Sequence, residues 1–213
     1  MMKRQHLIGW EERNMTLGIV DDHIPGTVML KKDMGNVTGL EFLDKIFFIT
    51  DGIMLQQIRE ISGVDGSTLQ NWVKRGWIAN TVNKKYSKEH LARILIINML
   101  RDSMLLERID FLMRYINGNI NDQADDIILE SQLYDYICRI VDVLMEKDET
   151  TSNRELRSYI TECTNDYVER VSGARKRLNR ALEIIVTVYY ASLIQKNSNT
   201  LYEKLVRGDA GND

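Results

Sequence analysis

The chain has 213 residues, a formal net charge of −3, a hydrophobic fraction of 44% and a single proline. This length suffices for one or two domains with a proper core, and the long runs of helix formers predict a mainly α-helical protein. The acidic balance excludes a general, histone-like polyanion binder, so any affinity for nucleic acid has to come from a local basic patch.

The first 45 residues show no dominant pattern. Gly18, Pro25, Gly26, Gly35 and Gly39 are mixed with scattered apolar residues, and no period persists long enough to predict an element. We therefore treat residues 1–45 as an N-terminal arm of unassigned structure. A short helix over residues 41–49 is expected to connect this arm to the segment that follows.

A helix and a sharp turn are predicted next. Leu55, Ile58 and Ile61 recur at a spacing of three and fit one face of a short helix. Gly63 follows directly, and glycine readily adopts the left-handed conformation that reverses the chain after a helix. The segment is thus typical of the first half of a helix-turn-helix.

A second short helix is predicted to begin near Thr68. Ser67 and Gln70 form the S-x-x-Q pattern of a capping box, in which the two side chains satisfy free amide groups at the helix start. Leu69, Trp72 and Val73 would face the first helix. The outward face would carry Thr68, Gln70, Asn71, Lys74 and Arg75, which is a polar, cationic reading face.

Residues 77–86 lack helical periodicity and predict a short β-hairpin, or wing, with Asn83, Lys84 and Lys85 near its tip. Such a tip can reach a phosphate backbone. From Gly66 to Arg101 the only acid is Glu89, whereas the basic residues are Lys74, Arg75, Lys84, Lys85, Lys88, Arg93 and Arg101. Seven minus one gives a local charge of +6, which is the electrostatic footprint of a polyanion-binding surface.

These residues resemble a known family. The residues Leu55, Ile58, Ile61, Gly63, Val64, Thr68, Leu69, Gly76 and Lys84 to Ser87 look like the winged helix-turn-helix of MerR-type bacterial transcription regulators. More narrowly, the runs NWVKRGW and NKKYSKEHLARILIINMLRD are similar to a bacterial family of largely uncharacterised proteins that carry a domain of unknown function with a MerR-like module. The resemblance covers roughly residues 50–117.

The resemblance implies DNA contacts from the reading helix and from the wing. In the MerR-type pattern a Thr-Leu-Arg-Tyr-Tyr run opens the reading helix. Here Gln70 and Asn71 replace the Arg and the first Tyr of that run. In the wing, where the pattern has an Arg, Lys84 keeps the positive charge. Gln and Asn can read adenine in the major groove. Because a capping-box Gln folds back on its own helix, Asn71 and Lys74 are favoured as readers. The full set of predicted DNA contacts is Ser67, Thr68, Gln70, Asn71, Lys74, Arg75, Asn83, Lys84, Lys85 and Tyr86.

Three further helical regions are predicted after the wing. A helix begins at Ser87 and extends over residues 88–104, and apolar spacing continues to Ile116 before Asn117 and Gly118 end the run. His90 in the first turn is expected to be solvated or close to phosphate. The acidic residues 119–126 mark a domain boundary, so residues 46–118 form the predicted winged helix-turn-helix domain.

Residues 119–206 are predicted to form an α-helical bundle domain for dimerisation and effector binding. Residues 127–146 are helical, with Glu130, Asp135, Asp142 and Glu146 expected on a solvated face, and Ser152 with Glu155 forms another capping box. The dimer contacts are predicted from apolar residues at heptad-like spacing, which are Leu178, Leu182, Ile185 and Tyr189. The alternative is that these helices pack on one another inside one chain. Residues 207–213 are predicted to be a disordered tail.

The cysteines and the apolar segments bear on the compartment. Cys138 and Cys163 belong to no C-x-x-C pair and have no histidine cluster nearby, so we expect reduced thiols in the cytoplasm and neither a metal site nor a cofactor. Residues 1–12 lack the apolar run of a signal peptide. Residues 181–194 are interrupted by Glu183 and are shorter than the roughly 20 residues of a membrane span.

Two hypotheses about function remain. No nucleotide-binding, nucleophile-elbow or zinc-protease motif is present, so an enzyme is not expected. The first hypothesis is a dimeric, sequence-specific DNA-binding transcriptional regulator with a small-molecule effector. The alternative is a protein-interaction adaptor whose basic patch meets an acidic partner. A steep loss of affinity with salt would distinguish DNA binding from a largely apolar adaptor interface.

Overall fold

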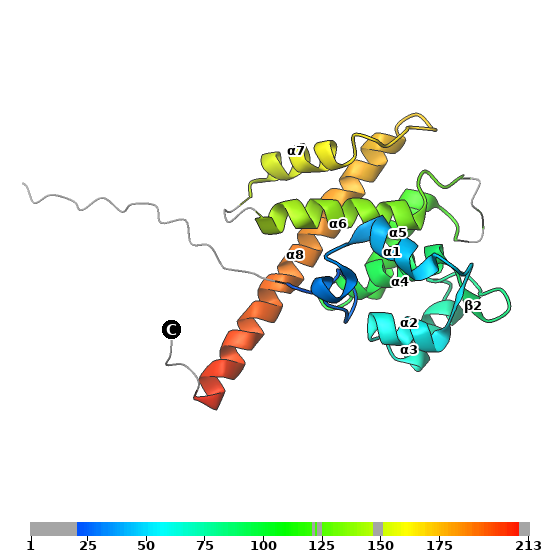
Figure 1. Ribbon diagram of the computed structural model, residues 1–213. Coiled ribbons are helices and arrows are strands. Elements are labelled where there is room, and N and C mark those ends of the chain that lie inside the picture. The colour runs from blue at the N-terminus through cyan, green and yellow to red at the C-terminus, as the bar shows by residue number, and fades with distance from the viewer. Residues whose placement is uncertain (1–20, 121, 123–124, 147–150, 209–213) are drawn as a thin grey trace, which may run out of the picture.

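The computed structural model describes residues 21–120, 122, 125–146 and 151–208 (Figure 1). Within them the fold is mainly α-helical, as expected. The helices are α1 (Gly39–Phe47), α2 (Leu55–Ser62), α3 (Gly66–Lys74), α4 (Lys88–Leu100), α5 (Leu106–Asn117), α6 (Glu130–Glu146), α7 (Asn153–Cys163) and α8 (Ala174–Arg207), with the 3-10 helix η1 (Lys31–Met34). The strands β1 (Ile53–Met54) and β2 (Lys85–Tyr86) form one antiparallel pair. Of the predicted tail, residues 209–213 lie outside the described residues.

The core is continuous across the expected domain boundary. In the described chain α6 packs against α1, α4, α7 and α8, and α4 also packs against α2 and α8. Leu91, Ile94, Leu95 and Ile96 of α4 are all fully buried, although they point in different directions around the helix. A helix that is apolar around its whole girth has to be covered on all sides. Both halves of the chain cover α4, so the core does not divide at residue 118.

The helix predicted over residues 88–104 ends early. In the structure α4 ends at Leu100, whose carbonyl oxygen accepts bonds from the backbone N–H groups of Ser103 (3.0 Å) and Met104 (2.8 Å). Leu105 is extended and precedes α5. The chain therefore turns back here, which lets α5 pack against α8.

The N-terminal arm is anchored to the acidic side of α6. Asp142 accepts hydrogen bonds from Lys31 Nζ (2.8 Å) and from Thr38 Oγ1 (2.9 Å), and Asp135 Oδ1 accepts one from the backbone N–H of Leu40 (2.8 Å). Asp135 is buried. The expectation of a solvated carboxylate face on α6 is thus wrong for Asp135, because the arm, which showed no sequence period, covers that face.

A buried arginine connects three helices to the segment after α3. The Arg93 guanidinium donates from Nε to the carbonyl oxygen of Trp77 (2.6 Å) and pairs through Nη1 with Glu130, and its Nη2 lies 4.0 Å from Asp110 Oδ1. Burial raises the pKa of Glu130, so the expectation of a solvated carboxylate is wrong for Glu130 as well. A charge of this kind is tolerated in a core only when it is paired. Arg93 therefore positions the backbone that leads from α3 to β2.

The same network makes stability depend on pH through Asp126. Burial, followed by the charges of Glu130 and Asp125, raises the pKa of Asp126 from 3.8 to about 6. Since the folded state then holds the proton more tightly than the unfolded chain, the protonated carboxyl favours folding below about pH 4 and that contribution is lost as the pH rises through 6.

We therefore expect Asp126→Asn to raise the melting temperature relative to the parent protein at pH 7.5, because it removes an ionised carboxylate from an acidic, half-buried site. The gain should shrink as the pH falls to 5. Thermal unfolding followed by circular dichroism at both pH values measures it, with the exposed Asp51→Asn as the control. An equal effect of Asp126→Asn at pH 7.5 and pH 5 would contradict this assignment.

The predicted dimer residues lie inside the chain. Leu178, Leu182, Ile185 and Tyr189 are buried in the core, where α8 packs against α4, α5, α6 and α7. They are therefore not a dimer surface, and the intramolecular alternative is the one observed. The heptad-like spacing identified a buried stripe, but spacing does not distinguish a partner helix from neighbours in the same chain.

The C-terminal part of α8 projects away from the rest of the protein (Figure 1). Its large apolar side chains Leu201, Tyr202, Leu205 and Val206 are exposed. No helix in the described part of the chain combines the length and the apolar character needed to cross a membrane.

Candidate nucleic-acid interface

Two short helices and the turn between them form the first part of the candidate site. α2 ends at Gly63, which has a φ of 70° and donates its N–H to the carbonyl oxygen of Arg59 (2.8 Å). A Cβ at this position would also lie 2.5 Å from Cγ1 of Val28. Both observations favour glycine, and the helix and the turn predicted from the sequence are confirmed. Ile58 and Ile61 are buried beneath the turn.

The start of α3 differs from the prediction. Asp65, rather than Ser67, caps the helix, because its Oδ1 accepts the N–H of Thr68 (2.9 Å). The hydroxyl groups of Ser67 and Thr68 also donate to the Asp65 carboxylate. These bonds, the one from Ser67 first, lower the pKa of Asp65. α3 thus begins at Gly66, and the two hydroxyls predicted to contact DNA serve the cap instead. Asp is as good a cap as Ser, so the sequence carried this signal.

The outer face of α3 is polar and exposed. Gln70, Asn71 and Lys74 are exposed, while Leu69 and Trp72 are buried against the rest of the module. Because Asp65 supplies the cap, Gln70 is not required to fold back on its own helix. This removes the reason for preferring Asn71 and Lys74 over Gln70, and all three side chains lie on the accessible face.

Arg75 is exposed but already has local partners. Its Nε donates to Asn71 Oδ1 (3.4 Å), its Nη1 lies 3.9 Å from Glu107, and its guanidinium lies 5.1 Å from the ring centroid of Trp77. These contacts are long and on the surface, so each is weak. Arg75 can give up these contacts to bind a phosphate, but its positive charge is already partly neutralised by Glu107.

A tight turn forms the second part of the site. Asn83 and Lys84 both have positive φ angles (52° and 60°), and the N–H of Lys85 donates to the carbonyl oxygen of Val82 (3.0 Å). Two successive positive φ values are typical of the type I′ turn that joins antiparallel strands. Asn83, Lys84 and Lys85 are exposed at this turn.

The predicted hairpin over residues 77–86 is only partly correct. β2 pairs with β1, which precedes α2, in the register Ile53 to Tyr86 and Met54 to Lys85. Trp77 and Ile78 are buried. The strand partner of β2 therefore lies 31 to 33 residues earlier in the chain (85 − 54 and 86 − 53), and this pairing places the 82–85 turn beside α2.

Tyr86 and His90 do not belong to the exposed surface. Tyr86 is buried, and burial raises its pKa; its ring meets that of His90 edge to face at 5.9 Å between centroids. His90 Nδ1 lies 2.6 Å from Ser87 Oγ, and this capping box starts α4. Burial lowers the pKa of His90. The predicted DNA contact at Tyr86 is wrong, because alternation along β2 turns this side chain inward. Of the expectation that His90 is solvated or close to phosphate, full solvation is wrong, because the side chain is partly buried at the cap of α4.

The positive charge that residues 66–101 present to solvent is smaller than their formal charge of +6. Arg93 is buried with Glu130, and Lys88 Nζ pairs with Asp44 (2.9 Å). Arg101 lies over the ring of Trp72, with 5.8 Å to the centroid. Besides Arg75, which already has local partners, Lys74, Lys84 and Lys85 are the cations of the segment that stand exposed at α3 and at the turn. A sequence count cannot separate charges that face solvent from those paired inside the fold.

The cysteines take no part in this surface. Cys138 and Cys163 are free thiols, and burial raises the pKa of each. Among the described residues no group of His, Cys, Asp and Glu side chains is arranged to hold a metal ion.

Comparison with known proteins gives a family match and one distant relative. Residues 41–137 match a domain of unknown function, DUF1836. An uncharacterized protein of Bacillus subtilis (strain 168), YkrK, is 27% identical over 132 residues, which cover 60% of this chain and 55% of that protein. The chain therefore aligns with about half the length of this relative. No solved structure matches the chain. The matched domain extends from α1 into α6, so it includes the whole candidate interface and crosses the expected boundary at residue 118.

Proposed function

We propose that this protein is a sequence-specific DNA-binding transcriptional regulator. In this proposal α2, α3 and the 82–85 turn form a winged helix-turn-helix of the MerR-like type. α3 enters the major groove with Gln70, Asn71 and Lys74 toward the bases. Lys84 and Lys85 contact the phosphate backbone beside it.

One observation carries the proposal: an exposed polar face on α3 occurs together with a tight turn that presents two lysines. Polar side chains that can pair with base edges are needed for reading, and point charges at a projecting turn suit phosphate contacts. The turn is held beside α2 by the β1–β2 pair, so its position relative to α3 is set by backbone hydrogen bonds. An ordinary solvated helix would require neither the turn nor its charges.

A dimer fits this function, and we assign its contact to the projecting end of α8. Two reading helices gain affinity and specificity by entering successive major grooves about 34–36 Å apart. Ile194, Leu201 and Leu205 are exposed and recur at spacings of seven and four, which places them on one side of the helix. A second copy of this helix could bury that stripe. The buried residues Leu178 to Tyr189 then hold α8 to its own chain.

Selection of bound fragments from random DNA, at low and moderate salt, tests this function. A recovered sequence motif and a steep loss of affinity with salt are expected. Asn71→Ala and Lys74→Ala should each relax the preference at particular base pairs, with a cost of roughly 1–3 kcal/mol for a base contact. Arg154→Ala, an exposed change on α7, is the matched control and should leave the motif unchanged. Recovery of the same motif with both α3 variants would show that α3 does not read bases.

A protein-interaction adaptor is the second candidate, and it has one supporting observation. Phe48 and Ile49, between α1 and β1, are 86% and 88% exposed. Large apolar side chains exposed next to each other can mark a protein contact. Selection that recovers no DNA at either salt concentration would favour this function over DNA binding.

A further inference from the structure

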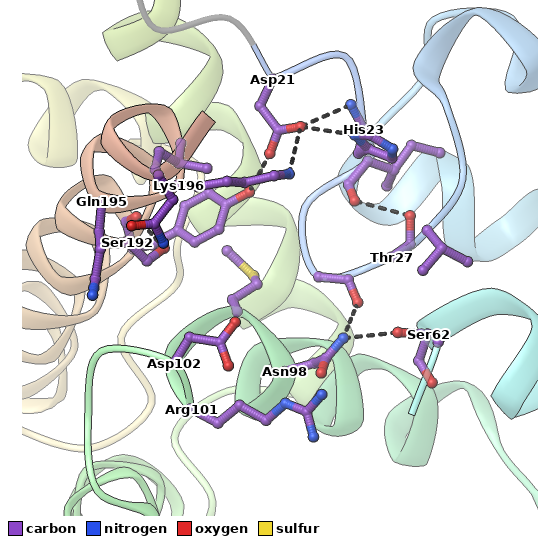
Figure 2. Close-up of a pocket in the computed structure, with 18 of the residues that line it drawn as sticks. Asp21, His23, Thr27, Ser62, Asn98, Arg101, Asp102, Ser192, Gln195 and Lys196 are labelled. Atoms are coloured by element: carbon purple, nitrogen blue, oxygen red, sulfur yellow. Dashed lines mark hydrogen bonds and ion pairs between the residues drawn. The ribbon is translucent and has the colours of Figure 1, made fainter. Parts of the chain in front are cut away.

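A groove lies where four separate parts of the chain meet (Figure 2). Its walls come from the N-terminal segment at Asp21 to Val28, the end of α2, the end of α4 and the projecting half of α8. Its volume is about 620 Å³. This is within the range of small-molecule sites, roughly 300–1,000 Å³.

Most hydroxyl and amide groups of the groove are already used within the fold. Thr27, Ser62 and Ser192 donate their hydroxyls to the backbone carbonyls of Ile24, Ile58 and Tyr189. The Asn98 amide donates to the carbonyl oxygens of Gly26 (2.9 Å) and Ser62 (2.8 Å). These groups shape the walls and join the N-terminal segment to the end of α2. They leave the charged side chains, together with the amides of Gln195 and Asn199, as the groups with capacity for a ligand.

The charged groups are of both signs and lie at two sides of the groove. At one side Lys196 of α8 lies 3.9 Å from Asp21, whose carboxylate also contacts His23 Nδ1 (3.0 Å). At the other side Arg101 and Asp102 follow the end of α4. Glu203, farther along α8, lies 3.3 Å from Arg207.

Arg101 has an unused donor. Its Nε is buried and has no hydrogen-bond partner in the described part of the protein. Leaving a buried charged donor unpaired costs free energy, and a bound carboxylate would remove that cost once the Arg101 side chain turns toward the groove. Asp102 is the next residue and is exposed. An anion alone would be repelled by Asp102, and a cation alone would be repelled by Arg101.

We propose that this groove binds a small zwitterion of the amino-acid type. Its carboxylate accepts hydrogen bonds from Arg101, and its ammonium group lies against Asp102. Ile24, Val28, Met99 and Leu193 contribute the apolar part of the lining. Lys196 and Asp21 close the far side, where they meet a polar or charged side chain of the ligand.

Arg101 also connects the groove to α3. Its guanidinium lies over the Trp72 ring, and Trp72 is a buried residue of α3. Asn98 holds the end of α2 from the same wall. Occupancy of the groove therefore alters the support of the α2–α3 unit, and this regulatory consequence rests on the proposed DNA-binding function.

Isothermal titration of the full-length protein with each of the twenty proteinogenic L-amino acids tests the ligand class. At least one is expected to bind with a Kd of about 1 mM or tighter. Its N-acetylated form and its decarboxylated amine should each bind about tenfold more weakly or worse, because each lacks one of the two charges. If no amino acid binds, or if either derivative binds as tightly as the parent, the proposal is wrong.

Two variants locate the site. Arg101→Gln and Asp102→Asn should each weaken binding of the selected amino acid by about tenfold or more. Since Arg101 supports Trp72, Arg101→Lys serves as a second variant that keeps the cation over the ring but loses the Nε donor, and it should also weaken binding. The matched control is Arg108→Gln on α5, an exposed arginine outside the groove. If Arg101→Lys and Asp102→Asn bind the amino acid as tightly as the Arg108→Gln control does, the proposed site is wrong.

Binding experiments with DNA distinguish the proposed amino-acid site from the proposed DNA-binding function. Only the regulatory role of the groove depends on that function. With the selected DNA motif, saturating amino acid should change the affinity for DNA about fivefold or more. Amino-acid binding without any DNA motif would refute the proposed function and leave the groove intact. A DNA motif without amino-acid binding would refute the groove and leave the function intact.

Discussion

Leu182→Ala is expected to lower the free energy of unfolding by roughly 2–5 kcal/mol, as for other large-to-small changes in a packed core. Leu182 is 0% exposed on the side of α8 that packs within the chain, so its loss leaves a cavity. Urea denaturation followed by circular dichroism measures the change. Ile184→Ala is the matched control, since Ile184 is 44% exposed on the same helix and lies outside the proposed dimer stripe, so its truncation should change stability by about 1 kcal/mol or less.

Sedimentation of Leu182→Ala and of Leu205→Ala, which lies in the proposed dimer stripe, separates core packing from dimerisation. The proposed dimer at the projecting end of α8 predicts that Leu205→Ala shifts the protein toward monomer, whereas folded Leu182→Ala stays dimeric. A full-length parent protein that sediments as a monomer at micromolar concentration would refute the dimer. Loss of dimerisation in folded Leu182→Ala, with no loss of stability, would restore the original assignment of the dimer residues.

Replacement of both lysines of the 82–85 turn should weaken binding to all DNA sequences alike. Each phosphate contact that is lost lowers the slope of log affinity against log salt by about 1 unit, so the double variant should lower it by about 2. Lys84 has a φ of 60°, so Lys84→Asn is preferable to alanine because asparagine tolerates this region. Lys85→Ala carries no such constraint. Titration of a labelled DNA duplex at several salt concentrations gives the slope.

The control for this pair is Lys45→Ala on α1, an exposed lysine outside the module that removes one charge without touching the turn. It should leave the slope unchanged. An unaltered slope in the Lys84→Asn, Lys85→Ala double variant would exclude the turn from the DNA interface. A loss of affinity that is equal for all DNA sequences, with an unchanged sequence motif, is expected for contacts that position the protein without reading bases.

The sequence by itself was sufficient to predict structural features that depend on residues close together in the chain. The α2 helix, the left-handed turn at Gly63, the helix start at Ser87 and the capping box at Ser152 were all predicted and are present. In each case the side chain and the backbone group it satisfies lie within a few residues, so the pattern carries the geometry. The cap of α3 was also a local feature, but two candidates competed and Asp65 prevailed over Ser67.

Only the tertiary structure decided which surfaces remain exposed. Periodicity showed that Leu182 would be buried, but not that other helices of the same chain, rather than a second copy, would cover α8. Likewise, the charge count could not show that Arg93 pairs with Glu130, or that β1 turns Tyr86 into the core. Each of these outcomes depends on residues 30 or more positions away. The spacing of apolar residues along one segment predicts which side chains will be buried. Which segment buries them depends on packing between distant parts of the chain.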